Sequence, residues 1–535
     1  SNATGIAQAS VELFVGPPRP NVVLFLVDDM GITDTSVPFV YTNGVEVPHR
    51  MNTNLYVTPN MELLAARGMK FTAAYSQTVC SPTRTSLMTG LNAPGHGVTC
   101  WVNPAGTSIG ANAPVNYLRQ GMTGFEETLP KWLSEAGYLA IHSGKAHFTH
   151  QFNPSVLDPE EEPTHIGFDI NIAGSYNGQP GSYLGTANYA NGSRPSWTIP
   201  GLEDHHGTTT FLTEACTIEA NEAVTETVNR GRPFFLYLSH YALHSPFTSD
   251  PRATNAYASL TGAAQRFATM IEGMDRSLGD VLTHLDTLGV AEDTLIFFLG
   301  DNGSDNPLNN HEAVPDAPWD DFLLRGKKGG EWEGGSRVPL IAAWARPNPA
   351  NPFQQAMPIV TNSVEHDIVA CWDLPVTIMS AAGLPIPGPV HGHDLSGYLA
   401  GTPGEHRPQD ILLYSPHGRN GDYFANYRVD HWKLIYRWQS DTFALYDLAV
   451  DPTEMNNLAG SQPAKLLEMA RGMARQFDEE WGPLGTLWPT FGPLSVSNLM
   501  GALDLDGDGL PDAAEDPDGN GLLDPGETDP DDRDT

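Results

Sequence analysis

The sequence is poor in basic residues. Its 535 residues include 28 lysines and arginines against 64 aspartates and glutamates, which gives a formal net charge of −36. Proteins that bind nucleic acid neutralise phosphates with a basic surface, so this balance argues against a nucleic-acid partner. The acidic excess suits a protein in a salty or extracellular setting.

Long apolar runs and cysteines are scarce as well. No apolar stretch approaches the roughly 18–20 residues of a transmembrane helix, so we expect no membrane span. The four cysteines, at positions 80, 100, 216 and 371, are too few for a disulfide framework and allow one bridge at most if Cys80 is catalytic. The opening Ser-Asn-Ala is typical of a cleaved tag. We expect that a secretion signal has been removed and that the protein is periplasmic or secreted.

What is present indicates a large globular protein. Hydrophobic residues make up 40% of the chain and charged residues 17%, which is typical of a folded rather than a disordered sequence. A chain of this length can bury a large core and should hold more than one domain or subdomain.

A helix is predicted to begin within residues 79–90, which read VCSPTRTSLMTG. Pro82 is tolerated in a first helical turn, and Ser81 is a reasonable N-cap. Cys80 would lie at the positive end of the helix dipole, where an anion is favoured. Arg84, one turn further, can reach the space around Cys80. A nucleophile precursor, a helix N-terminus and an arginine fork together describe a site for a tetrahedral oxyanion such as sulfate or phosphate.

The pattern Cys-x-Pro-x-Arg followed by Thr-Ser-Leu-Met-Thr-Gly resembles the signature of the type I sulfatases of the alkaline-phosphatase-like superfamily. The resemblance implies that a maturation enzyme oxidises Cys80 to Cα-formylglycine, the aldehyde whose hydrate is the nucleophile. The alternative interpretation is a small buried cysteine at the start of a helix.

Two buried strands are predicted to end in oxygen-bearing side chains. Residues 21–27 and 294–300 are continuous apolar runs, as in strands of a parallel sheet that is covered on both faces. The side chains that follow them are Asp28 and Asp29 after the first strand, and Asp301 and Asn302 after the second. Buried carboxylates are costly unless they are paired or bind a cation, and ligands bind at the carboxyl ends of such strands.

These four side chains form an all-oxygen set that prefers calcium or magnesium. The resemblance implies that they match the calcium ligands of the family, with oxygens of the formylglycine at Cys80 completing the shell. The alternative is structural: Asp29 as a helix N-cap, and Asp301-Asn302-Gly303 as a turn.

Three further motifs present basic side chains. Residues 137–147 predict a strand and a loop that resemble the family's Gly-Tyr…Gly-Lys-Trp-His block, in which Lys145 and His147 match the active-site lysine and histidine. Ala146 replaces the tryptophan, and Phe148-Thr149 replaces the usual Leu-Gly, which we interpret as altered packing rather than lost chemistry. Alone, this motif would be read as a solvated lysine and a loop histidine.

A third buried strand, over residues 233–239, leads to His244, which matches the catalytic histidine of the family's Ala-Pro-His-x-Pro motif although Leu243 replaces its proline. His240 precedes the motif and is assigned no role. The glycine-rich stretch 324–335 resembles the family's Gly-Lys-Gly…Trp-Glu-Gly-Gly block. Alignment on Trp-Glu places Lys328 on the active lysine, with Lys327 as the competing choice.

The resemblance implies a division of tasks at this site. The metal and Arg84 would hold the formylglycine and the sulfate oxygens, and Lys145 would bind the sulfate. His244, with Lys328 nearby, would bind the substrate and protonate the leaving alcohol. His147 would help the second hydroxyl of the hydrated aldehyde to lose its proton, so that sulfate is expelled.

The function that follows is hydrolysis of a sulfate ester, either an aryl sulfate or a sulfated carbohydrate. One alternative is a phosphonate or phosphate ester hydrolase of the same superfamily. A more remote alternative is a non-catalytic, calcium-dependent glycan-binding protein, which the intact set of basic side chains argues against.

The expected fold is α/β, with a large mixed, mostly parallel sheet sandwiched by helices in a catalytic domain over residues 19–360. A helix at 268–288 should pack on this sheet through an apolar stripe of Met270, Met274, Leu278, Val281 and Leu285. A smaller α/β subdomain over residues 361–490 is expected to hold a short antiparallel sheet and a helix near 464–477. Residues 451–458, DPTEMNNL, match the family's C-terminal signature.

The C-terminal tail, residues 503–530, carries two consecutive copies of a calcium-loop spacing. The first copy places acids at Asp504, Asp506, Asp508, Asp512 and Glu515, and the second places ligands at Asp516, Asp518, Asn520, Asp524 and Glu527. No helix-length segment separates the copies, so they are not an EF-hand pair; they are similar to the repeats of thrombospondin type 3 modules. Residues 504–535 hold 13 of the 64 acids and one arginine. The prediction is two calcium ions, and the alternative is a disordered acidic tail.

Overall fold

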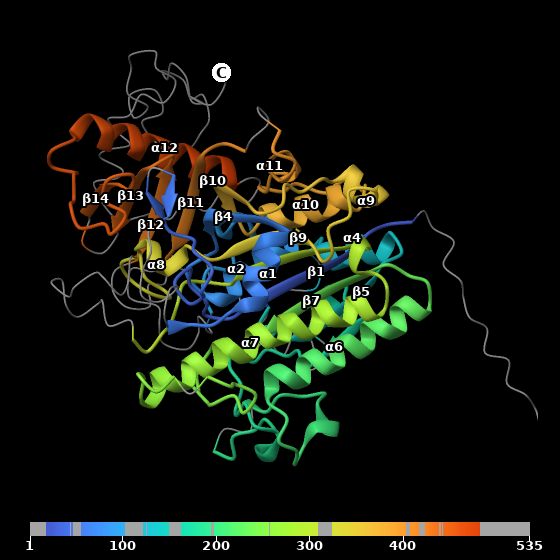
Figure 1. The fold of residues 1–535 in the computed structure, drawn as a ribbon. Coiled ribbons are helices and arrows are strands. Elements are labelled where there is room, and N and C mark those ends of the chain that lie inside the picture. Colours follow the sequence, from blue (N-terminus) through green and yellow to red (C-terminus); the bar gives the residue numbers. More distant parts are fainter. Residues whose placement is uncertain are drawn as a thin grey trace, which may run out of the picture.

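The computed structural model describes residues 18–42, 44–46, 55–101, 121–122, 124, 126–148, 162–193, 197–255, 257–308, 324–402, 407–416, 423–437, 440 and 442–481. The predicted calcium loops of the tail lie outside these residues and stay a prediction. Figure 1 shows a large sheet at the centre and a smaller one beside it that is formed by the C-terminal part of the chain; Tyr41–Thr42 and Val45–Glu46 pair as a further, two-stranded sheet.

The large sheet has eight strands in the order β10-β4-β9-β8-β1-β7-β5-β6. Their bounds are β1 (Asn21–Val27), β4 (Gly68–Tyr75), β5 (Leu139–Gly144), β6 (Ile170–Ile172), β7 (Phe234–His240), β8 (Thr294–Gly300), β9 (Leu340–Trp344) and β10 (Ser363–Ala370). β9 pairs antiparallel with both β4 and β8, and every other neighbouring pair is parallel. The predicted mixed, mostly parallel sheet is therefore confirmed.

Helices cover both faces of this sheet (Figure 1). One face packs against α1 (Pro59–Arg67), α6 (Leu212–Asn229) and α7 (Gly262–Thr287), and the other against α2 (Cys80–Thr89), α4 (Leu129–Glu135) and α10 (Asp373–Ala381). Strand β1 shows why two layers are needed: Val23, Phe25 and Val27 join the first core, whereas the alternate residues join the second. A strand of apolar residues has two apolar faces, and both must be buried.

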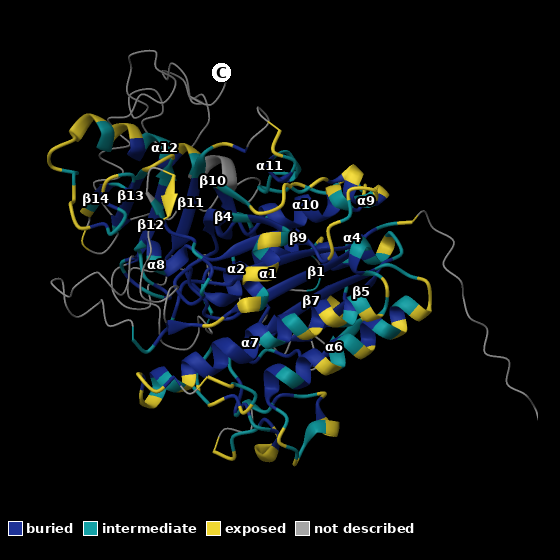
Figure 2. Cartoon of the chain, in the orientation of Figure 1, coloured by how far each residue is buried: buried dark blue, intermediate teal, exposed yellow. Residues whose placement is uncertain are grey.

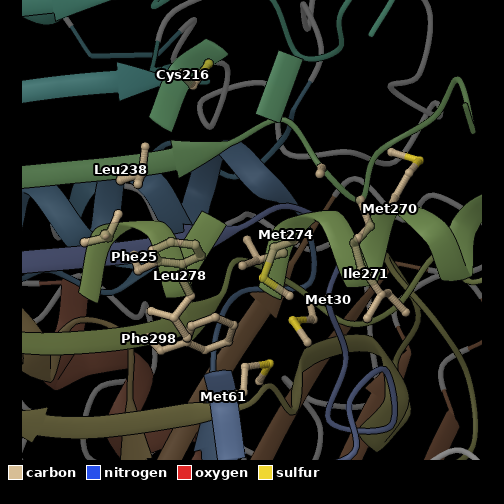
Figure 3. Close-up of a cluster of buried hydrophobic side chains, with 14 of the residues drawn as sticks. Phe25, Met30, Met61, Cys216, Leu238, Met270, Ile271, Met274, Leu278 and Phe298 are labelled. Carbon is tan, nitrogen blue, oxygen red and sulfur yellow. The ribbon is translucent and has the colours of Figure 1, made fainter. Parts of the chain in front are cut away.

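The predicted stripe on α7 forms the centre of one core layer. Met274 and Leu278 of α7 lie over Phe25 and Phe298 of the central strands, and the two phenylalanine rings stack with centroids 5.3 Å apart (Figure 3). All five residues of the stripe are buried. The helix begins at Gly262 rather than at residue 268, so its first two turns extend the same buried face. Figure 2 shows the opposite pattern on the outer sides of α6 and α7, which carry the exposed residues.

The smaller sheet is antiparallel, as predicted, and consists of β11 (Asp410–Ser415), β12 (Phe424–Val429), β13 (Trp432–Arg437) and β14 (Thr442–Asp447). Helix α12 (Pro463–Trp481) packs on it through Met469 and Met473. The expected domain boundary at residue 360 lies ahead of β10, which pairs with β4 in the large sheet. The chain changes sheet only after α11 (Ser396–Leu399).

Short elements complete the described part of the chain. They are β2 (Tyr41–Thr42), β3 (Val45–Glu46), α3 (Ala93–His96), α5 (Glu162–His165), η4 (Gly185–Ala187), η6 (Glu203–His205), η7 (Ala291–Asp293), α8 (Glu333–Ser336) and α9 (Pro352–Ala356). Among the described residues, no helix is long and apolar enough to cross a membrane.

The start of α2 differs from the prediction. The helix begins at Cys80, and its N-cap is Val79 rather than Ser81. The reason lies one turn further on, where the Thr83 hydroxyl accepts a hydrogen bond from the Gln77 N–H at 2.9 Å. This bond fixes the chain just before the helix without a side chain at the N-cap position. Cys80 still lies in the first turn, at the positive end of the helix.

Replacing Leu278 by alanine should destabilise the protein by about 2–5 kcal/mol, because a fully buried leucine leaves a cavity between α7 and the central strands. Chemical denaturation monitored by circular dichroism measures the change. The matched control is Thr283→Ala on the exposed side of the same helix, which should shift stability by no more than about 0.5 kcal/mol. Equal effects of the two variants would contradict the assignment of this face to the core.

Candidate active site

The carboxyl ends of four neighbouring strands meet at one edge of the large sheet. Register pairs Val27 of β1 with His240 of β7 and with Gly300 of β8, and it pairs Gly144 of β5 with Ser239 of β7. The residues that follow these strands must therefore lie next to one another. In open α/β sheets this edge is the usual place for a ligand.

Three carboxylates are brought together at this edge. Asp28, Asp29 and Asp301 each offer an oxygen, and these oxygens lie within 4.8 Å of one another. All three side chains are fully buried, as is that of Asn302. Asp28 Oδ1, Asp29 Oδ2 and Asn302 Oδ1 have no hydrogen-bond partner, although each is buried. Three buried oxygens without donors are the environment that a hard divalent cation requires.

The electrostatics of Asp28 support the same conclusion. Burial and the neighbouring charge of Asp301 raise the pKa of Asp28 well above its usual range, despite the opposing charge of Lys145. A divalent cation between the carboxylates would remove this repulsion and favour the ionised form. The residues present therefore fit a metal ion, with Asp28, Asp29, Asp301 and Asn302 as the side chains that would hold it.

Each carboxylate of the cluster has one close basic partner, within 2.8 Å. The pairs are Lys145 Nζ with Asp28 Oδ2 at 2.6 Å, Lys328 Nζ with Asp29 Oδ1 at 2.5 Å, and Arg84 Nη2 with Asp301 Oδ2 at 2.8 Å. Three positive charges thus balance three negative charges in the protein alone. A bound divalent cation would make the site positive, which suits an anionic substrate.

Arg84 lies near Cys80, as its spacing predicts, and its charge interacts with that side chain. Its guanidinium donates to Asp301 Oδ2 through Nε and Nη2, and Nη1 donates to the Lys145 carbonyl at 2.7 Å and to Ser239 Oγ at 2.5 Å. The side chain is fully buried. Arg84 therefore binds the ends of three strands together and neutralises Asp301, because nearly all its donors are directed at protein atoms.

Asp29 has a left-handed backbone, with φ of 60°. Its N–H donates to Asp301 Oδ1 at 3.0 Å, and Asn302 Nδ2 donates to its side-chain Oδ1 at 2.9 Å. Aspartate tolerates this conformation better than most residues. Burial alone would raise the pKa of Asp29, but the charges of Lys328 and His244 outweigh burial and lower the pKa far below its usual range.

His147 lies beside Cys80. Its ring Nδ1 is 3.3 Å from Cys80 Sγ. Its backbone N–H donates to the Ser175 carbonyl at 3.0 Å. The imidazole also lies against Gly178, where a Cβ atom would be 2.6 Å from His147 Cε1. Burial and the charges of Lys145 and Arg84 lower the pKa of His147 well below its usual range. His147 is therefore neutral here and can accept a proton.

His244 occupies the open side of the cluster. Its Nδ1 lies 2.8 Å from the Ser245 carbonyl, which assigns the ring proton to Nδ1 and directs Nε2 towards Asp29 Oδ2 at 3.9 Å. Its side chain is 16% exposed, whereas Cys80 is only 2% exposed. Among the described side chains that contact the cluster, His244 is thus the most exposed to solvent.

The structure brings Lys328 rather than Lys327 to the cluster, because it is Lys328 that pairs with Asp29 and is buried. His240, to which the sequence assigned no role, lies on the α7 side and bonds Ser277 Oγ at 2.8 Å. The sequence analysis missed Ser239, which holds Arg84. Its only signal was its position at the carboxyl end of a buried strand. None of Cys80, Cys100, Cys216 and Cys371 forms a disulfide.

This geometry defines a class of site: a buried carboxylate cluster at the carboxyl edge of a mostly parallel sheet, beside a cysteine at the start of a helix. Comparison with known proteins identifies the family. The model of the Sulfatase family matches residues 20–384, and the model described as N-sulphoglucosamine sulphohydrolase, C-terminal, matches residues 334–480. The chain belongs to the sulfatase family, whose members are sulfuric ester hydrolases.

The chain is similar to two characterised relatives and one solved structure. N-acetylgalactosamine-6-sulfatase of Mus musculus is 29% identical over 447 residues, which cover 80% of this chain and 74% of that protein. Arylsulfatase A of Homo sapiens is 27% identical over 532 residues, which cover 89% of this chain and 90% of that protein. The crystal structure of Ps i-CgsB superposes with a TM-score of 0.66 at 22% identity and covers 90% of this chain and 96% of that one.

Replacing Asn302 by alanine removes one of the three unpartnered oxygens without changing the charge of the cluster. We expect affinity for a divalent cation to fall at least about tenfold, the loss that even an outer-shell partner of a metal causes. The melting temperature of the chelated protein, followed across a buffered calcium series, gives the midpoint for wild type and variant.

The control for this experiment is Asp204→Asn, which removes an exposed carboxylate from η6 and should leave the midpoint unchanged. The acidic tail is identical in all three proteins, so its own binding cancels in the comparison. An unchanged midpoint in Asn302→Ala would place the cation elsewhere.

Proposed function

We propose that this protein hydrolyses sulfate monoesters of carbohydrate or aryl alcohols through a formylglycine formed from Cys80 and a calcium ion held by Asp28, Asp29, Asp301 and Asn302. The observation that carries the proposal is the position of Cys80. It is the first residue of α2, and its Sγ lies 3.3 Å from His147 Nδ1. The same edge of the sheet carries the buried side-chain oxygens that have no hydrogen-bond partner. Calcium is favoured because every side chain that could bind the ion offers oxygen.

The two groups that the family implies have clear tasks here. If formed at Cys80, a hydrated formylglycine would offer two hydroxyls, one as the nucleophile towards sulfur and one to be deprotonated when sulfate leaves, and a bound cation would polarise the sulfate oxygens. His147 is placed to take the proton of the second hydroxyl, because its Nδ1 already faces Cys80 Sγ. The maturation of Cys80 requires a separate enzyme as a partner.

Lys145 and Arg84 hold the anionic end of the site. Lys145 Nζ pairs with Asp28 and lies at the end of the strand next to β7, where it can share its remaining donors with a sulfate oxygen. Arg84 fixes Asp301 and the end of β7, and its charge lies beside Cys80, where it would help to hold the formylglycine and the sulfate oxygens. Both charges are in place before the substrate arrives, which is the condition for electrostatic stabilisation of the transition state.

His244 and Lys328 face the leaving group. Both contact Asp29, and His244 is the side chain of the cluster that reaches solvent. The alcohol part of the ester extends in that direction, so its oxygen departs past these two side chains. We assign protonation of the leaving oxygen to His244, which as an imidazolium would carry a second proton on Nε2, with the Lys328 ammonium beside it.

The tail and the compartment complete the proposal. We assign one calcium ion to each of the two acidic loops at residues 504–515 and 516–527, because each offers four or five oxygen-bearing side chains at the required spacing. We also propose a periplasmic or secreted location, where calcium is plentiful enough to keep such loops loaded. The acidic surface charge agrees with this setting.

Replacing Cys80 by alanine should abolish turnover of 4-nitrophenyl sulfate, because the side chain that becomes the nucleophile is lost. Wild-type protein produced with a formylglycine-generating maturation enzyme should carry an aldehyde at position 80. Peptide mass spectrometry detects the aldehyde, and a hydrazine probe should label wild type but not the variant.

Matched assays separate the alternatives. A higher kcat/KM for 4-nitrophenyl phosphate or a phosphonate ester than for the sulfate would show a phosphate or phosphonate hydrolase with the same nucleophile. Glycan binding without turnover of any ester would show a binding protein. Full activity of Cys80→Ala would contradict the mechanism itself.

Truncation after Gly501 should leave kcat/KM unchanged and lower the number of bound calcium ions by two. The expected reason is that every residue assigned to catalysis lies before residue 340, whereas the tail carries only the two calcium loops. Calcium content measured by mass spectrometry on the desalted proteins tests the stoichiometry. A folded but inactive truncation, or an unchanged calcium content, would contradict this assignment.

A further inference from the structure

The loop that carries Lys328 lies between the two sheets. On one side, Lys328 N–H donates to the Ser304 carbonyl at 3.0 Å and Gly329 N–H donates to the Thr78 carbonyl at 2.7 Å. These bonds hold the loop against residues that flank the carboxylate cluster and Cys80. Such bonds fix the backbone near Lys328, but the loop continues for several residues before α8 begins at Glu333.

The far end of this loop is held by the C-terminal sheet. Lys433 of β13 lies between two carboxylates, 3.1 Å from Glu333 Oε1 and 2.7 Å from Glu454 Oε1. Glu454 Oε2 accepts the Glu333 N–H at 2.7 Å, and the Glu454 carbonyl accepts Arg325 Nη1 at 2.7 Å. Glu454 therefore contacts both ends of the loop, before and after Lys328.

A second set of contacts holds the residues just before α8. Glu331 is bonded twice by Arg437 of β13, at 2.7 and 2.5 Å, and its carbonyl accepts Asn426 Nδ2 at 2.7 Å. The Trp332 ring stacks on the Arg325 guanidinium, 3.5 Å from the ring centroid. The loop is thereby folded back on itself and pressed against β12 and β13.

The charged groups that join the loop to the C-terminal sheet are buried, which indicates that they fix the geometry of the loop. Lys433, Glu333 and Glu454 are each no more than 2% exposed. Buried ion pairs add little net stability, because desolvation offsets their attraction, but they impose one geometry. Lys433 faces two carboxylates. Burial of Glu454 and the charge of Glu333 raise the pKa of Glu454 to about 7, despite the opposing charge of Lys433. An arrangement this costly is expected where position matters.

We propose that Lys433 and Glu454 of the C-terminal subdomain are positioning residues for Lys328: they fix both ends of residues 325–333 and so hold the Lys328 ammonium on Asp29, where it meets the substrate. The proposal rests on the role of Lys328 in the proposed function. It gives the smaller sheet a task in the reaction, although no residue of that sheet contacts the carboxylate cluster among the described interactions.

A double-mutant cycle tests this coupling. Lys433→Met should lower kcat/KM for 4-nitrophenyl sulfate at least about tenfold, since a displacement of about 1 Å at a catalytic group can cost up to a hundredfold. In a Lys328→Met background the same change should alter kcat/KM less than twofold, because the group that it positions is already gone. If Lys433→Met does not fold, Glu454→Gln replaces it, since glutamine keeps an acceptor for the Glu333 N–H.

The control is Arg407→Gln, which breaks another buried ion pair, between Arg407 Nε and Asp373 Oδ2 at 3.2 Å, away from the loop. Its effect should multiply with that of Lys328→Met. If the losses of kcat/KM caused by Lys433→Met and Lys328→Met also multiply in the double variant, the proposal is overturned and Lys433 has a purely structural role. Full activity of Lys328→Met would instead remove the assigned role of Lys328, while the Cys80 results remain an independent test of the sulfatase function.

Hydrogen exchange gives a readout that needs no turnover. Lys433→Met should speed amide exchange in residues 324–335 severalfold and leave that of β1 and β8 unchanged, because only the contacts of Lys433 with Glu333 and Glu454 are lost. Unchanged exchange in the loop, or equally faster exchange throughout the protein, would contradict positioning.

Discussion

The positions of several other elements depend on three buried carboxylates at one edge of the large sheet. Each aspartate of the cluster would be unfavourable alone, and each is matched by a base that comes from a different part of the chain: Lys145 from the end of β5, Arg84 from α2, and Lys328 from the loop before α8. Because removing any one base would leave a buried charge uncompensated, the elements that carry them must keep fixed positions. The parallel strands supply the aspartates at a common level, and the helices and loops around them are arranged to supply the bases.

The two sheets contribute to this arrangement in different ways. The large sheet places residues directly, because strand ends in register bring their successors together. The smaller sheet acts at a distance, through Arg437 and Lys433 on one strand and Glu454 in the turn that follows β14. Residues 451–458 therefore have a physical explanation in this chain: Glu454 closes the loop that begins at Arg325 and ends at Glu333.

Sequence reasoning identified what local pattern can reveal. Apolar runs ending in Asp-Asp and Asp-Asn predicted both the strands and the cluster, and the Cys-x-Pro-x-Arg motif predicted the start of α2 to within two residues. It was silent or wrong where the outcome depends on a distant partner. The direction of Arg84 depends on Asp301 and Ser239, the N-terminus of α2 on Thr83, and the membership of β10 on its pairing with β4. None of these partners is adjacent in the sequence, so spacing alone could not reveal them.

The burial of α2 has a consequence for the history of each molecule. All ten residues from Cys80 to Thr89 are buried, so the finished protein offers no extended peptide around Cys80 that another protein could grasp. If Cys80 is oxidised as proposed, the burial of α2 implies that the oxidising enzyme would have to reach it before the sheet and its helices close over it. On that proposal, a molecule that folds before the modification would retain the unmodified thiol.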